Sequence, residues 1–299
     1  MSIRNALFAA AMLAVIALPA TAEQKLTKRV NVASDATVEV SNVQGSVDVT
    51  AWDRNEVELV AVLESDKDEL EFEATERHVR IEVDRPKGKY RHGDADDAIL
   101  TLRVPKGARL IVDTVSADIN VSGARGEQRL KSVSGDVETQ AFDAPVSLAS
   151  VSGDVTLAGN GGKALVKTEN VSGSATVSGI RGSYEGEVVS GNISATVAAA
   201  QHLSVGSVSG DIDIRADLAP TARVEMESIS GVISLILKPP VNADFDIESF
   251  SGDIENCFGQ KARDTSKYTP GSELNFTQGS GGARVEIRTL SGEISICDR

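Results

Sequence analysis

The sequence predicts an all-β protein, and more specifically a β-solenoid that is similar to a single-stranded β-helix, with rungs of about 18–21 residues and an N-terminal β cap. Three observations lead to this prediction. A short motif recurs at nearly constant spacing through the C-terminal two thirds of the chain. The segments between its copies alternate apolar and polar residues, as strands with one buried face do. Helical periodicity is nearly absent after residue 22.

The chain begins with the layout of a secretory signal peptide, which we predict over residues 1–22. Arg4 supplies a basic start, residues 6–18 are largely apolar, and residues 20–22 are the small side chains that a signal peptidase accepts. The alternative is a retained anchor helix. The apolar run is shorter than the ~20 residues of a membrane-spanning helix, and no later run reaches that length. We therefore expect an exported protein, periplasmic or at the cell surface, without a membrane span after signal cleavage.

Residues 23–106 are the predicted N-terminal β-rich cap. This region is more charged and less regular than the rest, but it still alternates in strand-like segments such as Val57–Ala61 and Ile99–Val104. A solenoid needs a polar end to prevent edge-to-edge addition of further strands. The position and composition of this region suit that role.

Residues 107–299 carry the repeat, whose core is Ser, apolar, Ser, Gly, acidic or small, apolar, as in Ser132-Val-Ser-Gly-Asp-Val137. The first eight copies follow one another at steps of 18 to 21 residues, about the length of one solenoid rung. The ninth follows after 40 residues, which we interpret as an insertion around the two cysteines. The glycine register falls at Ala117, Gly135, Gly153, Gly173, Gly191, Gly210, Gly231, Gly252 and Gly292.

Alternation within one copy predicts which side chains face the core. Val133, Gly135 and Val137 share one parity and are expected to point inward, while Ser132, Ser134 and Asp136 are expected to point outward. A glycine between two core aliphatics suggests a corner or a neighbouring rung that leaves no room for a side chain. A bulge or a turn that needs the conformational freedom of glycine is the alternative.

Two cysteines, Cys257 and Cys297, lie near the C-terminus of a chain predicted to be exported. A disulfide is the favoured interpretation in an oxidising compartment. It would close a loop of about 41 residues, for which the chain-entropy estimate of stabilisation is about 4 kcal/mol. A free thiol or a metal pair is the alternative, and no histidine or further thiol stands nearby in sequence to favour a metal.

These motifs give the chain a resemblance to the DUF4097 family, often labelled "putative adhesin". The resemblance is carried by the Ser-Val-Ser-Gly-Asp-Val copies, by Ser41-Asn-Val-Gln-Gly45 leading to Val49-Thr-Ala-Trp-Asp53, and by Val104-Pro-Lys-Gly107. Asn256-Cys-Phe-Gly259 with Ile296-Cys297 also looks like proteobacterial members. The resemblance covers nearly the whole mature chain. It implies a β-solenoid-like fold and an envelope location, and it supplies no catalytic residues.

Acidic residues follow the glycine register, with Asp118, Asp136 and Asp154 in three consecutive copies. If the rungs stack in register, neighbouring carboxylates would repel by about 1 kcal/mol per pair even in water. Calcium would relieve that repulsion, so these three residues are candidate ligands. The favoured alternative is hydrogen bonding to local backbone at a turn, which also explains Ser174 and Asn192 at the same position. No cofactor is predicted.

The net charge and the arrangement of acidic residues and histidines limit the classes of function that the sequence supports. A formal net charge of −14 disfavours nucleic acid as a partner. The acidic residues recur with the repeat instead of converging on one patch, and the three histidines are isolated, which argues against an enzyme. We therefore predict a non-catalytic, adhesin-like binding or structural module whose partner is an envelope protein or a glycan. The alternatives are a periplasmic envelope-stress or regulatory interaction partner and, less favoured, a polysaccharide-active enzyme on a β-helix groove.

Overall fold

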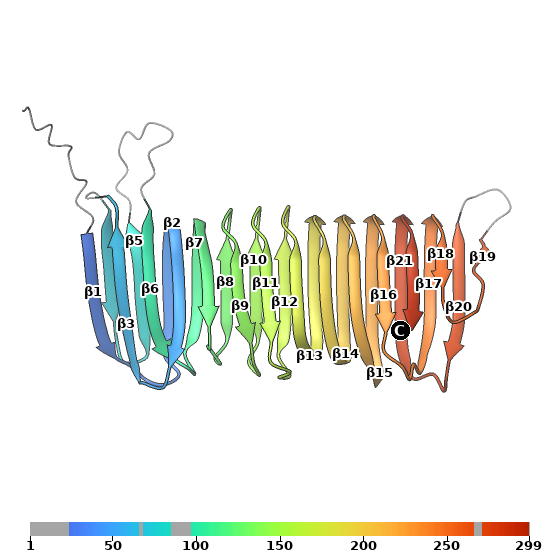
Figure 1. Cartoon of the computed structure of the whole chain (residues 1–299), viewed down its shortest axis with the longest axis horizontal. Helices are drawn as coiled ribbons and strands as arrows, with labels where there is room; N and C mark the ends of the chain where they lie inside the picture. Colours follow the sequence, from blue (N-terminus) through green and yellow to red (C-terminus); the bar gives the residue numbers. More distant parts are fainter. Residues whose placement is uncertain (1–23, 66–67, 85–96, 266–270, 299) are drawn as a thin grey trace, which may run out of the picture.

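The structure of the protein, a computed structural model, describes residues 24–65, 68–84, 97–265 and 271–298. The predicted signal peptide, residues 1–22, lies outside this range. All regular elements in the described residues are β-strands, so the predicted all-β class is confirmed. They form an elongated body with the strands lying across its long axis, β1 at one end and β20 near the other (Figure 1). Nothing in the described part of the chain is a helix of the length and apolarity needed to cross a bilayer.

The strands are joined into one hydrogen-bonded system. In chain order they are β1 (Gln24–Asn31), β2 (Thr37–Trp52), β3 (Glu56–Leu63), β4 (Glu69–Ala74), β5 (His78–Asp84), β6 (Ala98–Pro105), β7 (Arg109–Ser122), β8 (Gln128–Ser132), β9 (Val137–Ala141), β10 (Val146–Ser150), β11 (Val155–Gly159), β12 (Leu165–Asn170), β13 (Ala175–Ser190), β14 (Ile193–Ser209), β15 (Ile212–Ser230), β16 (Ile233–Leu237), β17 (Ala243–Ser251), β18 (Ile254–Asn256), β19 (Arg263–Asp264), β20 (Ser272–Gln278), β21 (Ala283–Ser291) and β22 (Ile294–Asp298).

Each repeat forms one rung, made of a strand before the glycine corner and a strand after it. We call the strands before the corner the front row and those after it the back row. In the front row β8 pairs in parallel with β10, and Ser132 lies beside Ser150. In the back row β9 pairs in parallel with β11, and Val137 lies beside Val155. One apolar core runs through all the rungs, because alternate side chains of both rows point inward.

Regular stacking begins within the segment assigned to the N-terminal cap. Strand β2 already spans a complete rung and pairs with β7 along both rows, with Gly45 beside Ala117. Beyond β2 the pairing becomes partly antiparallel: β4 pairs with β5 in the front row, and β3 lies between β6 and β1 in the back row. The irregular end therefore consists of β1 and β3–β6.

The predicted parity is wrong at the first two positions of the motif. Ser132 is only 3% exposed, whereas Val133 is 44% exposed. Strand β8 ends at Ser132 and β9 begins at Val137, so the residues between them turn the corner and the alternation of a strand does not continue through them. Gly135 and Val137 are buried and Asp136 is exposed, as predicted.

The glycine register is a site of close backbone contact. A Cβ added at Gly153 would overlap the carbonyl oxygen of Gly135, and one added at Gly135 would overlap that of Ala117. Neither glycine has a positive φ. Of the two explanations raised by the sequence, lack of space between rungs therefore applies at these positions.

The last two rungs stack in the reverse of their sequence order. Strand β21 lies between β15 and β17, and β22 lies between β16 and β18. The interpretation of the 40-residue step as a simple insertion is therefore incomplete. In chain order the outer rung, β17–β18, comes first and is followed by β19 and β20. The inner rung, β21–β22, comes last.

A disulfide fastens this reversed pair of rungs. Cys257, just after β18, is bonded to Cys297 in the neighbouring β22, so the predicted pairing is confirmed. Phe245 stacks on Phe276 of β20 with ring centroids 4.5 Å apart. The C-terminal end is thus closed by an aromatic contact and a covalent bond.

Candidate binding groove

The candidate calcium ligands form a hydrogen-bonded column. The Oδ1 atom of Asp118 accepts the backbone N–H of Asp136 at 2.9 Å, and Oδ1 of Asp136 accepts that of Asp154 at 2.8 Å. Asp154 accepts the N–H of Ser174 in the same way at 2.8 Å. These side chains bond to the next rung rather than to a local turn, which explains why Ser and Asn also serve at this position: each supplies a short oxygen acceptor.

No group of three or more His, Cys, Asp or Glu in the described residues is arranged to hold a metal ion. Asp118, Asp136 and Asp154 each have one oxygen committed to the neighbouring backbone. Calcium binding by these three residues stays a prediction.

A second column, of buried hydroxyl groups, closes the inside of the corner. Ser132 Oγ accepts the N–H of Gly135 at 2.8 Å, and Ser150 Oγ accepts that of Gly153 at 2.9 Å. Thr114 occupies the same position in β7 and donates to the Ala117 carbonyl at 2.8 Å. These polar groups satisfy backbone atoms that turn away from the strand ladder at the corner.

A third column consists of large apolar side chains that face solvent, each 43% to 64% exposed. They occupy the second position of the motif, one per rung. We call this column the apolar ridge, and in order along the body it contains Val115, Val133, Val151, Val171, Val189, Val208, Ile229, Leu290 and Phe250. Phe250, at 64%, is the most exposed of them.

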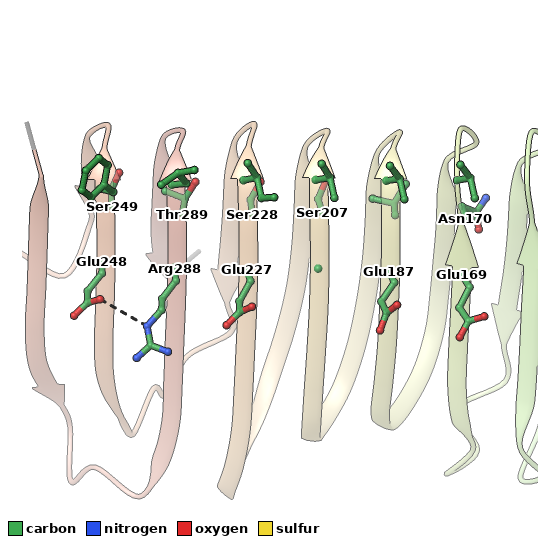
Figure 2. Close-up of a pocket in the computed structure, with 18 of the residues that line it drawn as sticks. Glu169, Asn170, Glu187, Ser207, Glu227, Ser228, Glu248, Ser249, Arg288 and Thr289 are labelled. Atoms are coloured by element: carbon green, nitrogen blue, oxygen red, sulfur yellow. Dashed lines mark ion pairs between the residues drawn. The ribbon is translucent and has the colours of Figure 1, made fainter.

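On the outer face of the front row, two residues before the ridge side chains from Val171 to Phe250, runs a row of mostly acidic positions. Strand pairing places each beside the next. We call it the acidic row; it contains Glu169, Glu187, Gly206, Glu227, Arg288 and Glu248 (Figure 2). Before Val115, Val133 and Val151 the same position holds Asp113, Lys131 and Ala149.

The apolar ridge from Val151 to Phe250 and the acidic row line one shallow groove of about 1020 Å³. Ser207 and its equivalents, the last buried front-row residues before the corner, lie between the two lines. Thr265 and Ser272 lie at the C-terminal end of the groove. The groove therefore crosses seven successive rungs along the long axis of the body.

The charges of the groove are only partly balanced. Lys167 lies 2.6 Å from Glu169, whose hydrogen bond and charge raise the pKa of the lysine. Arg288 lies 3.7 Å from Glu248, as the dashed line in Figure 2 marks. Within the described residues no ion pair joins Glu187 or Glu227 to a cation. Because Glu169 and Glu187 stand side by side in register, like charges also repel there.

Gly206 interrupts the acidic row halfway along. A Cβ added at Gly206 would meet no atom within 4 Å, so packing does not require glycine there. Gly186 is different, because a Cβ at that position would lie 2.6 Å from the hydroxyl of buried Tyr184. Glycine inside a strand is intrinsically unfavourable. At Gly206 its effect is to leave a notch between Glu187 and Glu227.

The stacked rungs and their corner columns extend over most of the region in which one family model matches the chain. That model, Toastrack DUF4097, covers residues 36–297. The chain belongs to the Toastrack DUF4097 family. The resemblance seen in the sequence is therefore confirmed, and it includes the rung of β2 as well as the disulfide-linked C-terminal rungs.

Two solved structures similar to this Toastrack chain come from Bacteroides fragilis and Clostridium sporogenes. A "putative adhesin" from Bacteroides fragilis shares 14% identity with a TM-score of 0.44, and the match covers 93% of this chain and 99% of that one. A "putative cell adhesion protein" from Clostridium sporogenes shares 10% identity with a TM-score of 0.25, covering 93% and 100%. No curated protein matches the chain.

In this Toastrack chain, sequence reasoning located the aspartate column and the two cysteines but missed the groove. The signal was present: an apolar residue stands between two serines in copy after copy, as at Val133, Val151 and Val208. Interpreting Ser-x-Ser-Gly as a corner instead of a strand would have directed that residue outward. The acidic row would then have followed from Glu187 and Glu227, two positions earlier.

Proposed function

We propose that this protein is a non-catalytic, adhesin-like binding module of the cell envelope, a β-solenoid scaffold that holds a protein partner along its groove. The supporting observation is the apolar ridge, a continuous line of exposed aliphatic side chains on a protein otherwise rich in surface charge. Contiguous apolar surface of this kind is typical of interaction sites. An exported location, in the periplasm or at the cell surface, agrees with the Cys257–Cys297 disulfide.

The composition of the groove favours a protein over a glycan. Six of the seven ridge side chains that line it are aliphatic, and Phe250 is the single aromatic one. Aliphatic contacts need apolar side chains opposite them, and the apolar centre of a protein interface supplies those. A glycan would offer mostly hydroxyl groups to this surface.

The arrangement of carboxylates supports a binding role over catalysis. Hydrolysis of a glycosidic bond uses two carboxyl groups on either side of one bond. Here Glu169, Glu187 and Glu227 are spread along a line, as the stacking of repeats dictates.

The test is capture of envelope proteins by the immobilised full-length exported chain and by a variant with Val189→Asp and Val208→Asp. Ser194→Asp and Thr196→Asp, at exposed positions on the back-row part of β14, make the charge-matched control. We expect partners that the control retains and the ridge variant loses, with unchanged melting temperatures. Mass spectrometry of the captured protein would show whether the role is adhesive or regulatory, as in an envelope-stress pathway.

Equal capture by the wild-type chain and the ridge variant would refute the proposal. Binding to a glycan array that the two ridge substitutions leave unchanged would also refute it, because the partner would then be a sugar bound elsewhere.

A further inference from the structure

We propose that the occupant of the groove is a basic amphipathic helix of the partner protein, about 20 residues long, lying parallel to the long axis of the body. This inference rests on the proposed function and specifies the chemistry of the partner. Four features of the described residues support it: the closed backbone of the front row, the spacing of the rungs, the charge on both sides of the apolar ridge, and the notch at Gly206.

The backbone of the groove has no free edge. The front-row part of β14 pairs with β13 on one side and β15 on the other, and β21 pairs with β15 and β17. A partner in extended conformation therefore finds no backbone donors or acceptors to pair with, as it would at an exposed sheet edge. The groove offers side chains only, so the backbone groups that an occupant turns toward it must be hydrogen-bonded within the occupant, and a helix does this.

The spacing of the rungs suits a helix. Parallel rungs repeat at about 4.8 Å, and one helical turn rises about 5.4 Å, so each turn can place one apolar side chain against about one ridge residue. From Val151 to Phe250 the groove spans seven ridge residues, or roughly 29 Å at that spacing. A helix of about 19 residues has this length, and its mismatch with the rungs stays below one rung over the whole contact.

Charge lies on both sides of the apolar ridge. Glu187 and Glu227 lie beside it in the acidic row. Asp154 and Asp211, both exposed, follow the ridge residues Val151 and Val208 by three positions, after the corner. The complementary surface is an apolar stripe with Lys or Arg along both of its borders. That is the pattern of a basic amphipathic helix and not of an acidic or neutral one.

The notch at Gly206 and the exposed Phe250 give this helix two anchor points. Gly206 leaves room at the middle of the acidic row for one large side chain of the partner. Phe250 stands at the C-terminal end of the ridge, where an exposed aromatic ring is suited to fill a pocket between helical side chains.

The test uses three synthetic peptides of about 20 residues and the full exported chain at physiological ionic strength. The first contains Leu and Lys with Leu at helical spacing; the second has the same composition with strictly alternating Leu and Lys; the third is the helical peptide with Glu for Lys. We expect the first to bind at least about tenfold more tightly than the second in fluorescence anisotropy, and the third not to bind. Equal binding of the first two would show nonspecific attraction to an acidic protein and would overturn the inference.

Variants of the protein test whether the peptide binds in the groove. Gly206→Phe should fill the notch and weaken binding about tenfold, whereas Ser194→Phe, at an exposed position on the back-row part of the same strand, should leave it unchanged. The pair Glu187→Lys and Glu227→Lys should weaken binding more than Glu138→Lys and Glu255→Lys, which alter the net charge equally from exposed back-row positions. Equal effects of the two members of either comparison would contradict a site in the groove.

Failure of this inference differs from failure of the proposed function. Ridge-dependent capture of envelope proteins without a preference for the helical peptide would reject the helix and keep the binding role. If the Val189→Asp and Val208→Asp variant still captured envelope proteins and still bound the helical peptide, both the inference and the proposed function would be rejected.

Discussion

The buried hydroxyl column and the apolar ridge occupy adjacent positions of the same motif, yet their exposures are opposite to what side-chain polarity suggests. Ser150 is 3% exposed and Val151 is 43% exposed. The serine lies inside because its Oγ accepts the N–H of Gly153 at a corner where the strand ladder is interrupted. The valine next to it is turned outward by that same corner. At a corner, backbone hydrogen bonding decides which side chain is buried, and the apolar side chain next to it is left exposed.

The difference predicts that substitutions on the inner side of the corner affect folding and that those on the outer side affect binding. The largest effect is expected for Gly153→Val, since even its Cβ would overlap the backbone of Gly135. We expect a loss of about 3 kcal/mol or more of unfolding free energy, or no folded protein. Gly206→Ala, which meets open space, should instead stabilise the chain by roughly 0.5–1 kcal/mol. Urea denaturation followed by circular dichroism measures both, and similar effects of the two would contradict the structural distinction.

A buried polar pair inside the front row, Tyr184 and Thr168, makes the stability of the fold depend on pH. Burial raises the pKa of Tyr184 to about 12, and its hydroxyl lies 2.9 Å from Thr168 Oγ1. An unfolded tyrosine titrates near 10, so between about pH 10 and 12 the unfolded state loses its proton first. The tyrosine's contribution to stability is complete below pH 10 and is lost as the pH rises through about 12, by about 2–3 kcal/mol.

The check on Tyr184 is the difference between the wild-type chain and Tyr184→Phe in chemical denaturation from pH 8 to 12. The phenylalanine variant should lack this part of the alkaline loss, although other groups titrate in both proteins. Parallel curves would mean that the hydroxyl of Tyr184 is not held in its neutral form by burial.

Ser150→Ala should have an intermediate effect. It leaves the N–H of buried Gly153 without its acceptor, which costs about 1–3 kcal/mol. Ser152→Ala, at the exposed serine of the same copy, should change stability by less than about 0.5 kcal/mol. The melting temperatures of the two variants provide the measurement; a larger loss for Ser152→Ala would reverse the assignment of inner and outer positions.

Much of the fold could be predicted from the repeat alone. The spacing of the glycine register indicated the rungs, and the strand alternation indicated a core shared by all of them. The reversed order of the last rungs could not be predicted, because pairing of β21 with both β15 and β17 depends on contacts between distant segments rather than on local spacing. Nothing in the 40-residue step distinguishes an insertion from a chain that returns to fill an inner position.

The groove was missed for a related reason, although the sequence carried a signal for it. Side chains in a strand alternate, and Val133 was assigned inward by extending that rule through residues that turn instead. The disulfide and the aspartate column were predictable, because residue type and repeat position suffice for them. Placing Glu187 beside Gly206 and Glu227 requires the register of three strands.

The smallest stability effect is expected on the apolar ridge. Replacing Val171, Val189 and Val208 by Thr keeps the β-branched shape while adding a hydroxyl to each exposed side chain. Each change should alter the free energy of unfolding by less than about 0.5 kcal/mol, since solvent already reaches these positions. The same triple variant should lose ridge-dependent capture of the partner, because apolar contact at the centre of the groove is removed. If the three threonines destabilised the fold as strongly as Ser150→Ala, the apolar ridge would contribute to the packing of the rungs. The assignment of folding to the buried hydroxyl column and of binding to the apolar ridge would then be wrong.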